Sequence, residues 1–133
     1  MKNVKTILLV DDEPEILTVI EIMLNDMGFN VISAQSGESA LSILRSGAII
    51  DLVITDYRMP RMDGAEFIAE LRKFLPSLPV IMITASGGVE LFIKALSLGV
   101  FEYINKPIVR NELERIVKAA LFRTGYDNSL SIS

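Results

Sequence analysis

The sequence predicts an α/β fold in which helices cover both faces of a parallel sheet. Five short apolar runs alternate with five segments whose apolar residues recur every three or four positions, as they do on one face of a helix. Strands that alternate with helices in this way form parallel sheets through right-handed crossovers. Half of the 133 residues are apolar, which suits strands buried on both sides. We therefore expect one doubly wound domain with five strands and five helices.

The five predicted strands are short and rich in Val, Ile and Leu. They cover residues 7–10, 30–34, 52–55, 80–83 and 103–105. Each is followed by a polar residue or a turn signal, and each is short enough for one crossing of a small sheet.

The first two predicted helices follow the first two strands. Apolar residues step by three and four through residues 16–27, with Pro14 near the start, where a missing N–H costs nothing. Gly28 follows the end of this helix. Ser36 can cap a second helix, which stops near Gly47.

The remaining helices have similar signals. Asp63 can cap the third, and Glu66 three residues later gives a capping-box pattern. The fourth ends at Gly99, the fifth covers residues 109–122, and residues 123–133 are polar and lack periodicity. The apolar residues expected to face the sheet are Phe67, Ile68, Leu71 and Leu75 in the third helix, Leu91, Phe92, Ala95 and Leu98 in the fourth, and Leu113, Ile116, Val117 and Ala120 in the fifth.

Composition and charge narrow the possible functions. The net charge is −4 and no stretch is rich in Lys or Arg, so direct nucleic-acid binding is not expected. No apolar run approaches the roughly 20 residues of a membrane span, and the first strand follows Met1 too closely for a signal peptide. The sequence therefore predicts a cytoplasmic protein without a membrane partner.

Cys and His are both absent from the chain. Their absence excludes disulfides, thiolate chemistry and imidazole acid–base catalysis, together with the usual ligands of transition metals. A metal bound here must accept oxygen ligands, which favours Mg²⁺.

Polar residues suited to phosphate or metal follow four of the five strands. Asp11 and Asp12 follow the first strand, Asp56 the third, Thr84 the fourth and Lys106 the fifth. The carboxyl ends of parallel strands meet at one edge of a sheet, which is where ligands bind in open α/β folds. We therefore expect these five side chains to converge.

Together these residues could perform phosphoryl transfer. A strand-end Asp56 can act as a nucleophile, Asp11 and Asp12 can hold Mg²⁺, and Lys106 and Thr84 can bind phosphoryl oxygens. Each residue alone has a simpler explanation, because an aspartate or a threonine can cap a helix and Lys-Pro can form a turn. Their coincidence at one edge favours the functional interpretation.

Four stretches carry a family resemblance. They are residues 7–13 (ILLVDDE), residues 51–60 (DLVITDYRMP) with Met-Asp-Gly at 62–64, residues 83–85 (ITA) and residues 103–107 (YINKP). In this combination the chain resembles the receiver domain of response regulators, which act in two-component signalling and phosphorelays. The resemblance covers residues 5–122 as one receiver domain and leaves 123–133 as a polar C-terminal tail.

The resemblance implies a flavodoxin-like sheet in the strand order 2-1-3-4-5. It also implies that Asp56 is the phosphoacceptor, that a sensor histidine kinase or a phosphotransfer protein is the donor, and that Asp12 binds Mg²⁺ directly. Asp11 would bind Mg²⁺ mainly through water, while Asp56 and the backbone carbonyl of Arg58 would complete the protein ligands.

A switch is also implied. Thr84 and Lys106 would hold the phosphoryl group, and the bond between Lys106 and Pro107 is expected to be cis. If Thr84 is drawn toward the phosphoryl group, it leaves space into which Tyr103 can rotate. The fourth helix, fifth strand and fifth helix would then present a readout face to a downstream effector or to a second copy in a homodimer. The alternative is that Tyr103 is an edge-strand aromatic with a fixed rotamer.

Two departures from the family pattern qualify this picture. Arg58, two residues after Asp56, is bulky and basic and overlooks the path of a water attacking an acyl phosphate. We hypothesise that Arg58, together with Ser86, tunes the phosphorylated lifetime; the alternative is a solvated loop arginine. Phe101 and Ile116 place apolar groups near the readout face, where the winged-helix transcription-factor subfamily tends to have charges.

Three other classes stay open at this stage. A phosphatase of the haloacid dehalogenase type also uses a strand-end Asp with Mg²⁺, but it needs a second acid where Arg58 stands. A flavodoxin-like cofactor binder needs a phosphate-cradling loop where residues 11–13 are acidic. A pseudo-receiver would be an interaction module without phosphorylation. A true receiver would catalyse only its own phosphorylation and dephosphorylation, and it could stand alone or belong to a longer or hybrid protein.

Overall fold

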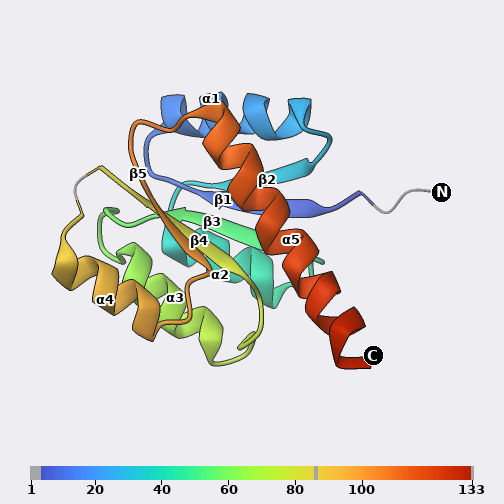
Figure 1. The fold of residues 1–133 in the computed structure, drawn as a ribbon. Coiled ribbons are helices and arrows are strands. Elements are labelled where there is room, and N and C mark those ends of the chain that lie inside the picture. The colour runs from blue at the N-terminus through green and yellow to red at the C-terminus, as the bar shows by residue number, and fades with distance from the viewer. Residues whose placement is uncertain (1–3, 86, 133) are drawn as a thin grey trace.

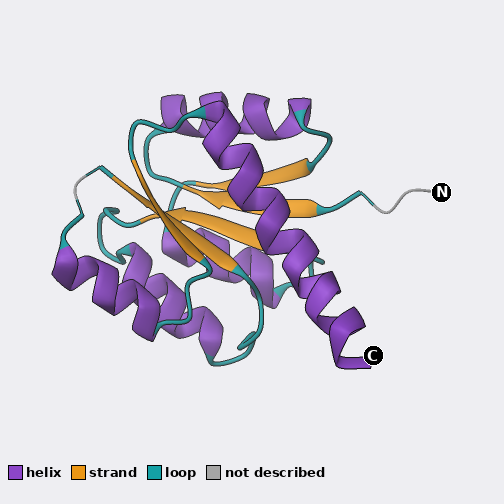
Figure 2. Cartoon of the chain, viewed as in Figure 1, coloured by secondary structure: helices purple, strands orange, loops and turns teal. Residues whose placement is uncertain are grey.

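The computed structural model describes residues 4–85 and 87–132, with side chains to residue 122. A five-stranded parallel sheet in the order β2-β1-β3-β4-β5 forms its centre (Figures 1 and 2). The strands are β1 (Thr6–Val10), β2 (Asn30–Ala34), β3 (Leu52–Asp56), β4 (Val80–Thr84) and β5 (Glu102–Asn105). The predicted fold class and strand order are confirmed.

Five helices cover the sheet on both faces. Two of them, α1 (Pro14–Asp26) and α5 (Arg110–Ile132), lie on one face, and α2 (Gly37–Arg45), α3 (Gly64–Arg72) and α4 (Val89–Ser97) lie on the other (Figure 1). No helix in the described part of the chain is both long and apolar enough to cross a bilayer.

The register of the strands brings their carboxyl ends to one edge. Val10 of β1 pairs with Thr55 of β3, and Asp56 of β3 pairs with Ile83 of β4. Thr84, the last residue of β4, pairs with Asn105 of β5. The residues that close or follow these strands therefore lie side by side.

Side chains cap two of the helices as predicted. Ser36 Oγ accepts a hydrogen bond of 3.1 Å from the backbone N–H of Ser39 at the start of α2. At the start of α3, Asp63 Oδ1 accepts from the N–H of Glu66 at 2.8 Å, and Glu66 Oε1 accepts from the N–H of Asp63 at 3.0 Å. This reciprocal pair is a capping box, and it fixes where α3 begins relative to the end of β3.

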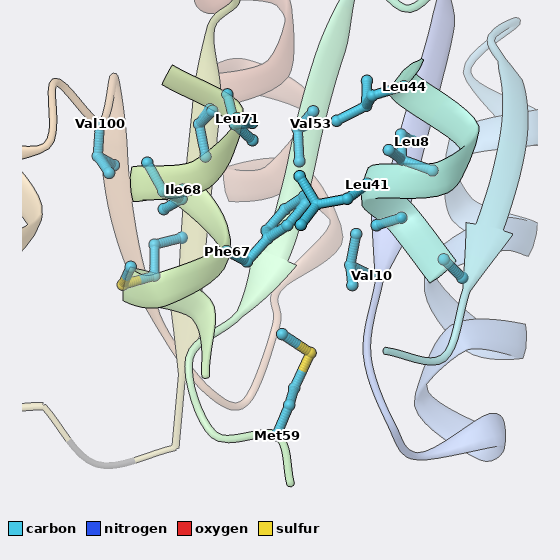
Figure 3. Close-up of a cluster of buried hydrophobic side chains, with 14 of the residues drawn as sticks. Leu8, Val10, Leu41, Leu44, Val53, Met59, Phe67, Ile68, Leu71 and Val100 are labelled. Carbon is cyan, nitrogen blue, oxygen red and sulfur yellow. The ribbon is translucent and has the colours of Figure 1, made fainter. Parts of the chain in front are cut away.

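The core consists of two apolar layers, one on each face of the sheet. Phe67 of α3 is fully buried and meets Leu41 of α2 over Val53 of β3 (Figure 3). The other layer joins α1 and α5 to the opposite face of the sheet. Every residue of β3 and β4 is buried, as expected for central strands covered on both sides.

Two predictions about apolar residues need correction. Phe92 was expected to face the sheet, but its side chain is 46 % exposed, and Ala95 provides the buried contact of α4. Ile116 was also placed near the readout face, but it is buried between α5 and the sheet, as the helical periodicity predicted, while Phe101 is half-buried. α4 carries apolar residues around much of its circumference, so periodicity alone could not select its inner face.

The last helix is longer than predicted. We expected it to end at Phe122, but α5 continues to Ile132, and Ser133 lies outside the described residues. No proline interrupts the chain before Ile132, and each added helical residue gains a backbone hydrogen bond, so the helix continues through Gly125. Figure 1 shows these last turns extending beyond the sheet.

Arg72 links α3 to the end of α4. Its Nε donates to the carbonyl of Leu98 at 3.1 Å and its Nη2 to the carbonyl of Gly99 at 3.0 Å, just after α4. Its Nη1 donates to the carbonyls of Leu75 and Leu78 in the connection to β4. One guanidinium thus satisfies carbonyls from two separate segments, and it places positive charge at the carboxyl end of α4, where the helix dipole favours it.

We expect Arg72→Met to lower the free energy of unfolding by about 1.5–3 kcal/mol, because the charged donor is lost while the aliphatic length is kept. Urea denaturation followed by circular dichroism measures this. Lys73→Met is the matched control, since Lys73 is next in sequence and makes an exposed ion pair with Glu70 worth less than about 1 kcal/mol. Equal losses in the two variants would contradict the assigned role of Arg72.

Candidate functional site

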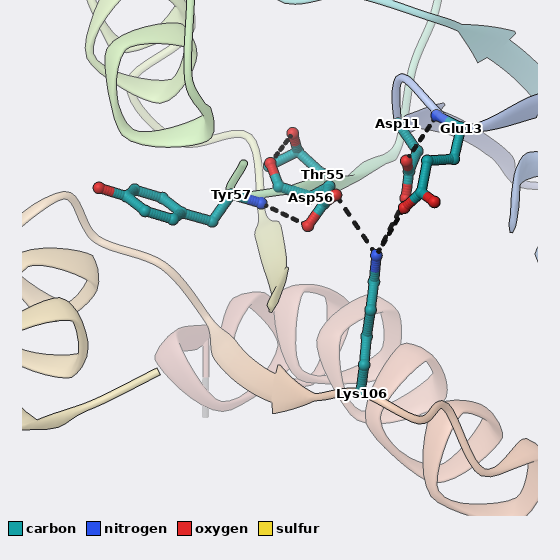
Figure 4. A network of polar contacts seen from close by, with 6 residues as sticks. All are labelled: Asp11, Glu13, Thr55, Asp56, Tyr57 and Lys106. Carbon is teal, nitrogen blue, oxygen red and sulfur yellow. Dashed lines mark hydrogen bonds and ion pairs between the residues drawn. The ribbon is translucent and has the colours of Figure 1, made fainter. Parts of the chain in front are cut away.

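Asp56 lies at the carboxyl edge of the sheet, as the last residue of β3. Its side chain is 6 % exposed, and Oδ1 accepts a hydrogen bond of 2.8 Å from the backbone N–H of Tyr57 (Figure 4). The hydroxyl of Thr55 donates to the backbone carbonyl of Asp56 at 3.0 Å. These bonds hold the carboxylate in one orientation, and the Tyr57 ring points away from it.

Lys106 reaches into the same edge from the end of β5. Its backbone N–H donates to the carbonyl of Thr84 at 2.8 Å, which ties the two strand ends together. Its ammonium nitrogen lies 3.3 Å from Asp56 Oδ2, 3.6 Å from Asp11 Oδ2 and 3.8 Å from Glu13 Oε1 (Figure 4). The peptide bond between Lys106 and Pro107 is cis, as expected.

Asp11 and Asp12 complete a group of acids. Asp11 is almost fully buried, and its Oδ1 accepts from the N–H of Glu13 at 2.9 Å. One carboxylate oxygen from each of Asp11, Asp12 and Asp56 lies within 4.8 Å of the others. Glu13 was quoted only as part of a motif and was given no role, although its place in the acidic run of residues 11–13 was the available signal.

The pKa values of these groups show how crowded the charge is. Burial, reinforced by repulsion from Asp56, raises the pKa of Asp11 to about 6, although the N–H of Glu13 opposes the shift. Burial also raises the pKa of Asp56, with Lys106 acting against it. Burial would lower the pKa of Lys106, but the charges of Asp11 and Asp56 outweigh it and raise that pKa. The ammonium therefore stays charged at neutral pH, and the acids need more positive charge than it supplies.

This donor set fits a hard divalent cation. Asp11, Asp12 and Asp56 offer carboxylate oxygens that are close enough to share one ion. Carboxylates are the ligands that Mg²⁺ prefers, and the chain has no His or Cys to attract a softer metal. The pKa of Asp11 is raised mainly by burial and further by repulsion from Asp56, and an added cation would favour the charged carboxylate against both.

The other predicted site residues lie around this group. Thr84 is fully buried at the end of β4, beside Asp56 in the sheet. Arg58 is exposed and, with Asp12 and Asp63, lines an open cavity of about 350 Å³. Ser86 lies outside the described residues.

Tyr103 lies on the α4 side of β5 rather than among the acids. Its ring meets the ring of Phe92 edge to face, with centroids 5.9 Å apart and an interplanar angle of 86°. Both rings and Phe101 line a groove of about 200 Å³ between α4 and β5. The ring is half-buried, and its hydroxyl oxygen is fully enclosed.

Gly64 is a further residue that positions the site. Its N–H donates to the carbonyl of Tyr57 at 2.7 Å, and a Cβ at this position would overlap the carbonyl of Asp56 and lie 2.9 Å from the Cα of Tyr57. Only glycine allows α3 to begin this close to the end of β3. Gly64 belongs to the Met-Asp-Gly motif at residues 62–64, but this positioning role was not predicted for it.

Comparison with known families identifies the arrangement. The family described as "Response regulator receiver domain" matches residues 7–118. The chain belongs to this receiver-domain family. The phosphatase and flavodoxin-like cofactor-binder alternatives are thereby set aside, and the match includes all the strands that carry the acidic group.

Individual relatives agree with this assignment. The receiver domain is 38 % identical over 115 residues to the transcriptional regulatory protein GlrR of Escherichia coli (strain K12), covering 86 % of this chain but 26 % of GlrR. It is 41 % identical over 122 residues to the probable transcriptional regulator ycf27 of Cyanophora paradoxa, covering 92 % of this chain and 50 % of that protein. The chain therefore spans a quarter to a half of the length of these relatives.

Solved structures share the fold. A response regulator receiver domain protein from Clostridium thermocellum aligns with a TM-score of 0.86 and 33 % identity, covering 92 % of this chain and 98 % of that one. The CheX-CheY-BeF3-Mg²⁺ complex from Borrelia burgdorferi aligns with a TM-score of 0.81 and 31 % identity, covering 86 % of this chain and 87 % of that one.

The raised pKa of Asp11 predicts a pH-dependent stability. The folded metal-free receiver holds the Asp11 proton up to about pH 6, whereas an unfolded chain releases it near the ordinary value of 3.8. Because the folded state binds more protons in this window, stability falls as pH rises from about 4 to 6 and stays lower above it. Asp11→Asn should therefore raise the free energy of unfolding at pH 7.5, by roughly 1–3 kcal/mol, and by less at pH 5.

Chemical denaturation of the metal-free protein at both pH values measures this effect. Asp26→Asn, which removes an exposed acid at the far end of α1, should change stability by less than about 0.5 kcal/mol. A loss of stability in Asp11→Asn at pH 7.5 would contradict the unfavourable burial of the charged Asp11 carboxylate.

Proposed function

We propose that Asp56 of this receiver domain accepts a phosphoryl group and that the phosphorylated form regulates a partner through the face formed by α4, β5 and α5. The observation that carries the proposal is the position of the Asp56 carboxylate, 3.3 Å from the Lys106 ammonium and close to the carboxylates of Asp11 and Asp12. This is a nucleophile with a cation and a metal-binding acid group at one edge of the sheet.

The transfer conserves atoms and charge in a simple way. A carboxylate oxygen of Asp56 attacks phosphorus, and the bond from phosphorus to the donor's imidazole nitrogen breaks. Its electron pair leaves with the imidazole, and the product is an acyl phosphate on Asp56. Lys106 remains protonated and neutralises charge on a phosphoryl oxygen, and the Thr84 hydroxyl can donate to another. Positioning and charge neutralisation supply most of the catalysis of such transfers.

We infer that Mg²⁺ is the cofactor. Asp12 and Asp56 would bind it directly, Asp11 mainly through water, and the Arg58 backbone carbonyl would complete the protein ligands. When bound, Mg²⁺ supplies positive charge that offsets the repulsion between the acids and the incoming phosphoryl group. The CheX-CheY complex from Borrelia burgdorferi, which shares this fold, contains both BeF3 and Mg²⁺, and this supports the assignment.

Membership of the family suggests both the phosphoryl donor and the downstream partner of this domain. We infer that a sensor histidine kinase or a phosphotransfer protein is the donor. The curated relatives are transcriptional regulators of which this chain spans only a quarter to a half, which supports a downstream effector protein or domain as the partner. A homodimer through α4, β5 and α5 is a further possibility. The chain would catalyse only its own phosphorylation and dephosphorylation.

Phosphorylation at Asp56 can be measured directly. Incubation with acetyl phosphate and Mg²⁺ should add a single phosphoryl group by intact mass, and chelation of Mg²⁺ or Asp56→Asn should abolish the addition. Asp51→Asn, at the other end of β3, is the matched control and should be phosphorylated normally, because the Asp51 side chain accepts a bond from the N–H of Thr6 at the opposite edge of the sheet.

Absence of both phosphorylation and millimolar Mg²⁺ binding would favour the pseudo-receiver. Failure with acetyl phosphate alone would call for the same measurement with a phosphorylated histidine-kinase domain as the donor.

We propose further that Arg58, with Ser86, tunes the lifetime of the acyl phosphate. Arg58 lines the cavity beside Asp12 and also a groove beside α4. From this position, two residues after Asp56, its side chain can restrict the access of water to an acyl phosphate on Asp56. Arg58→Ala should accelerate dephosphorylation by more than about twofold, because it opens the path of the attacking water. Decay of the phosphorylated mass in Mg²⁺ buffer measures the rate. Arg61→Ala, in the same loop but paired with Glu38, should leave it unchanged.

A further inference from the structure

The Tyr103 hydroxyl lies where a side chain of residue 87 would be. A Cβ built on Gly87 would overlap the Tyr103 hydroxyl oxygen and lie 2.6 Å from Cζ and 3.2 Å from Cε1. Gly87 belongs to the connection between β4 and α4, and Tyr103 lies in β5, so the two meet only in the folded chain. The loop and the ring therefore occupy one shared space.

The backbone does not explain why residue 87 is a glycine. Its φ lies outside the left-handed region, where glycine alone is favoured. Gly88, the next residue, has an extended backbone with φ of −159°, and a Cβ there would meet nothing within 4 Å. Of these two neighbouring glycines, one is crowded by Tyr103 and the other is open.

In the described structure the Tyr103 ring points between α4 and β5 with its hydroxyl enclosed, which we call the inward position. Packing, rather than a hydrogen bond, accounts for this position. The edge-to-face contact with Phe92 orients the ring. The hydroxyl is enclosed, yet it has no hydrogen-bond partner among the described residues. Burial of the ring favours the inward position, but enclosing a hydroxyl without a partner costs free energy. The free-energy difference between the inward and outward positions of the ring is therefore smaller than ring burial alone would give. A small steric change can then decide between them.

We propose that Gly87 is the positioning residue that admits Tyr103 to its inward place, so that any side chain at residue 87 holds the ring outward. The steric relation stands by itself, and its signalling consequence rests on the proposed function. With Tyr103 outward, the groove between α4 and β5 changes shape while the acids at Asp56 are untouched, because Tyr103 lies on the far side of β4 from them. Gly87 would thus couple the phosphorylation site to the readout face without taking part in the chemistry.

The test compares Gly87→Ala with Gly88→Ala, which makes the same change one residue away without crowding Tyr103. The Tyr103 ring signal is observed by NMR in protein with labelled tyrosine and is identified by its loss in Tyr103→Leu. Protection of this signal from a soluble paramagnetic agent reports whether the ring is inward. The measurement is made on each variant, with and without Mg²⁺ and beryllium fluoride.

We expect the ring to be protected in the unsubstituted chain and in Gly88→Ala, and to lose most of that protection in Gly87→Ala. Equal protection in Gly87→Ala and the unsubstituted chain under both conditions would overturn the proposal. So would a ring that is unprotected in the unsubstituted chain under both conditions.

A double-mutant cycle separates the steric effect from general damage to the loop. Gly87→Ala should lower the denaturation midpoint when Tyr103 is present and lower it by less than half as much in the Tyr103→Leu background, where no hydroxyl reaches the loop. Equal losses in the two backgrounds would contradict the proposal. Gly87→Ala should still take up one phosphoryl group at Asp56. If the unsubstituted chain takes up none, the proposed function fails, and the ring protection still decides the role of Gly87.

Discussion

Uncompensated negative charge at one edge of the sheet is the constraint on which the rest of this structure depends. Lys106 faces Asp11, Glu13 and Asp56 together, and burial of the two aspartates raises their pKa values even beside that cation. Lys106 alone does not balance the negative charge of this site. The site is suited to gaining positive charge, and the phosphoryl transfer proposed for Asp56 would require that charge.

The surrounding fold keeps these charges close in spite of their repulsion. β3 is buried along its whole length, so the Asp56 backbone cannot move away, and the N–H groups of Tyr57 and Glu13 hold the carboxylates of Asp56 and Asp11. Gly64 lets α3 start directly against the strand end. The apolar layers on both faces of the sheet thus supply the stability that the polar edge lacks.

Much of this could be predicted from the sequence, because the strand ends are local features. Runs such as residues 52–55 followed by Asp56 specify both a buried strand and the residue at its carboxyl end. The direction in which Phe92 faces was predicted wrongly, since α4 is apolar on more than one side and only its neighbours select the inner one. The contact of Gly87 with Tyr103 joins two elements distant in sequence, and no local pattern contains it. The same holds for the role of Arg72, which appears in the sequence as an ordinary helix-ending charge.

The two ends of α4 are held very differently. At its carboxyl end, the guanidinium of Arg72 binds the carbonyls of Leu98 and Gly99 and joins them to the connection before β4. At its amino end, Gly88 provides no side-chain cap. A displacement that begins beside the acids would therefore turn α4 about its anchored carboxyl end. The movement would be greatest at Val89 and smallest at Ser97, so a partner seated along the exposed apolar side of this helix would sense a change of tilt rather than a uniform shift.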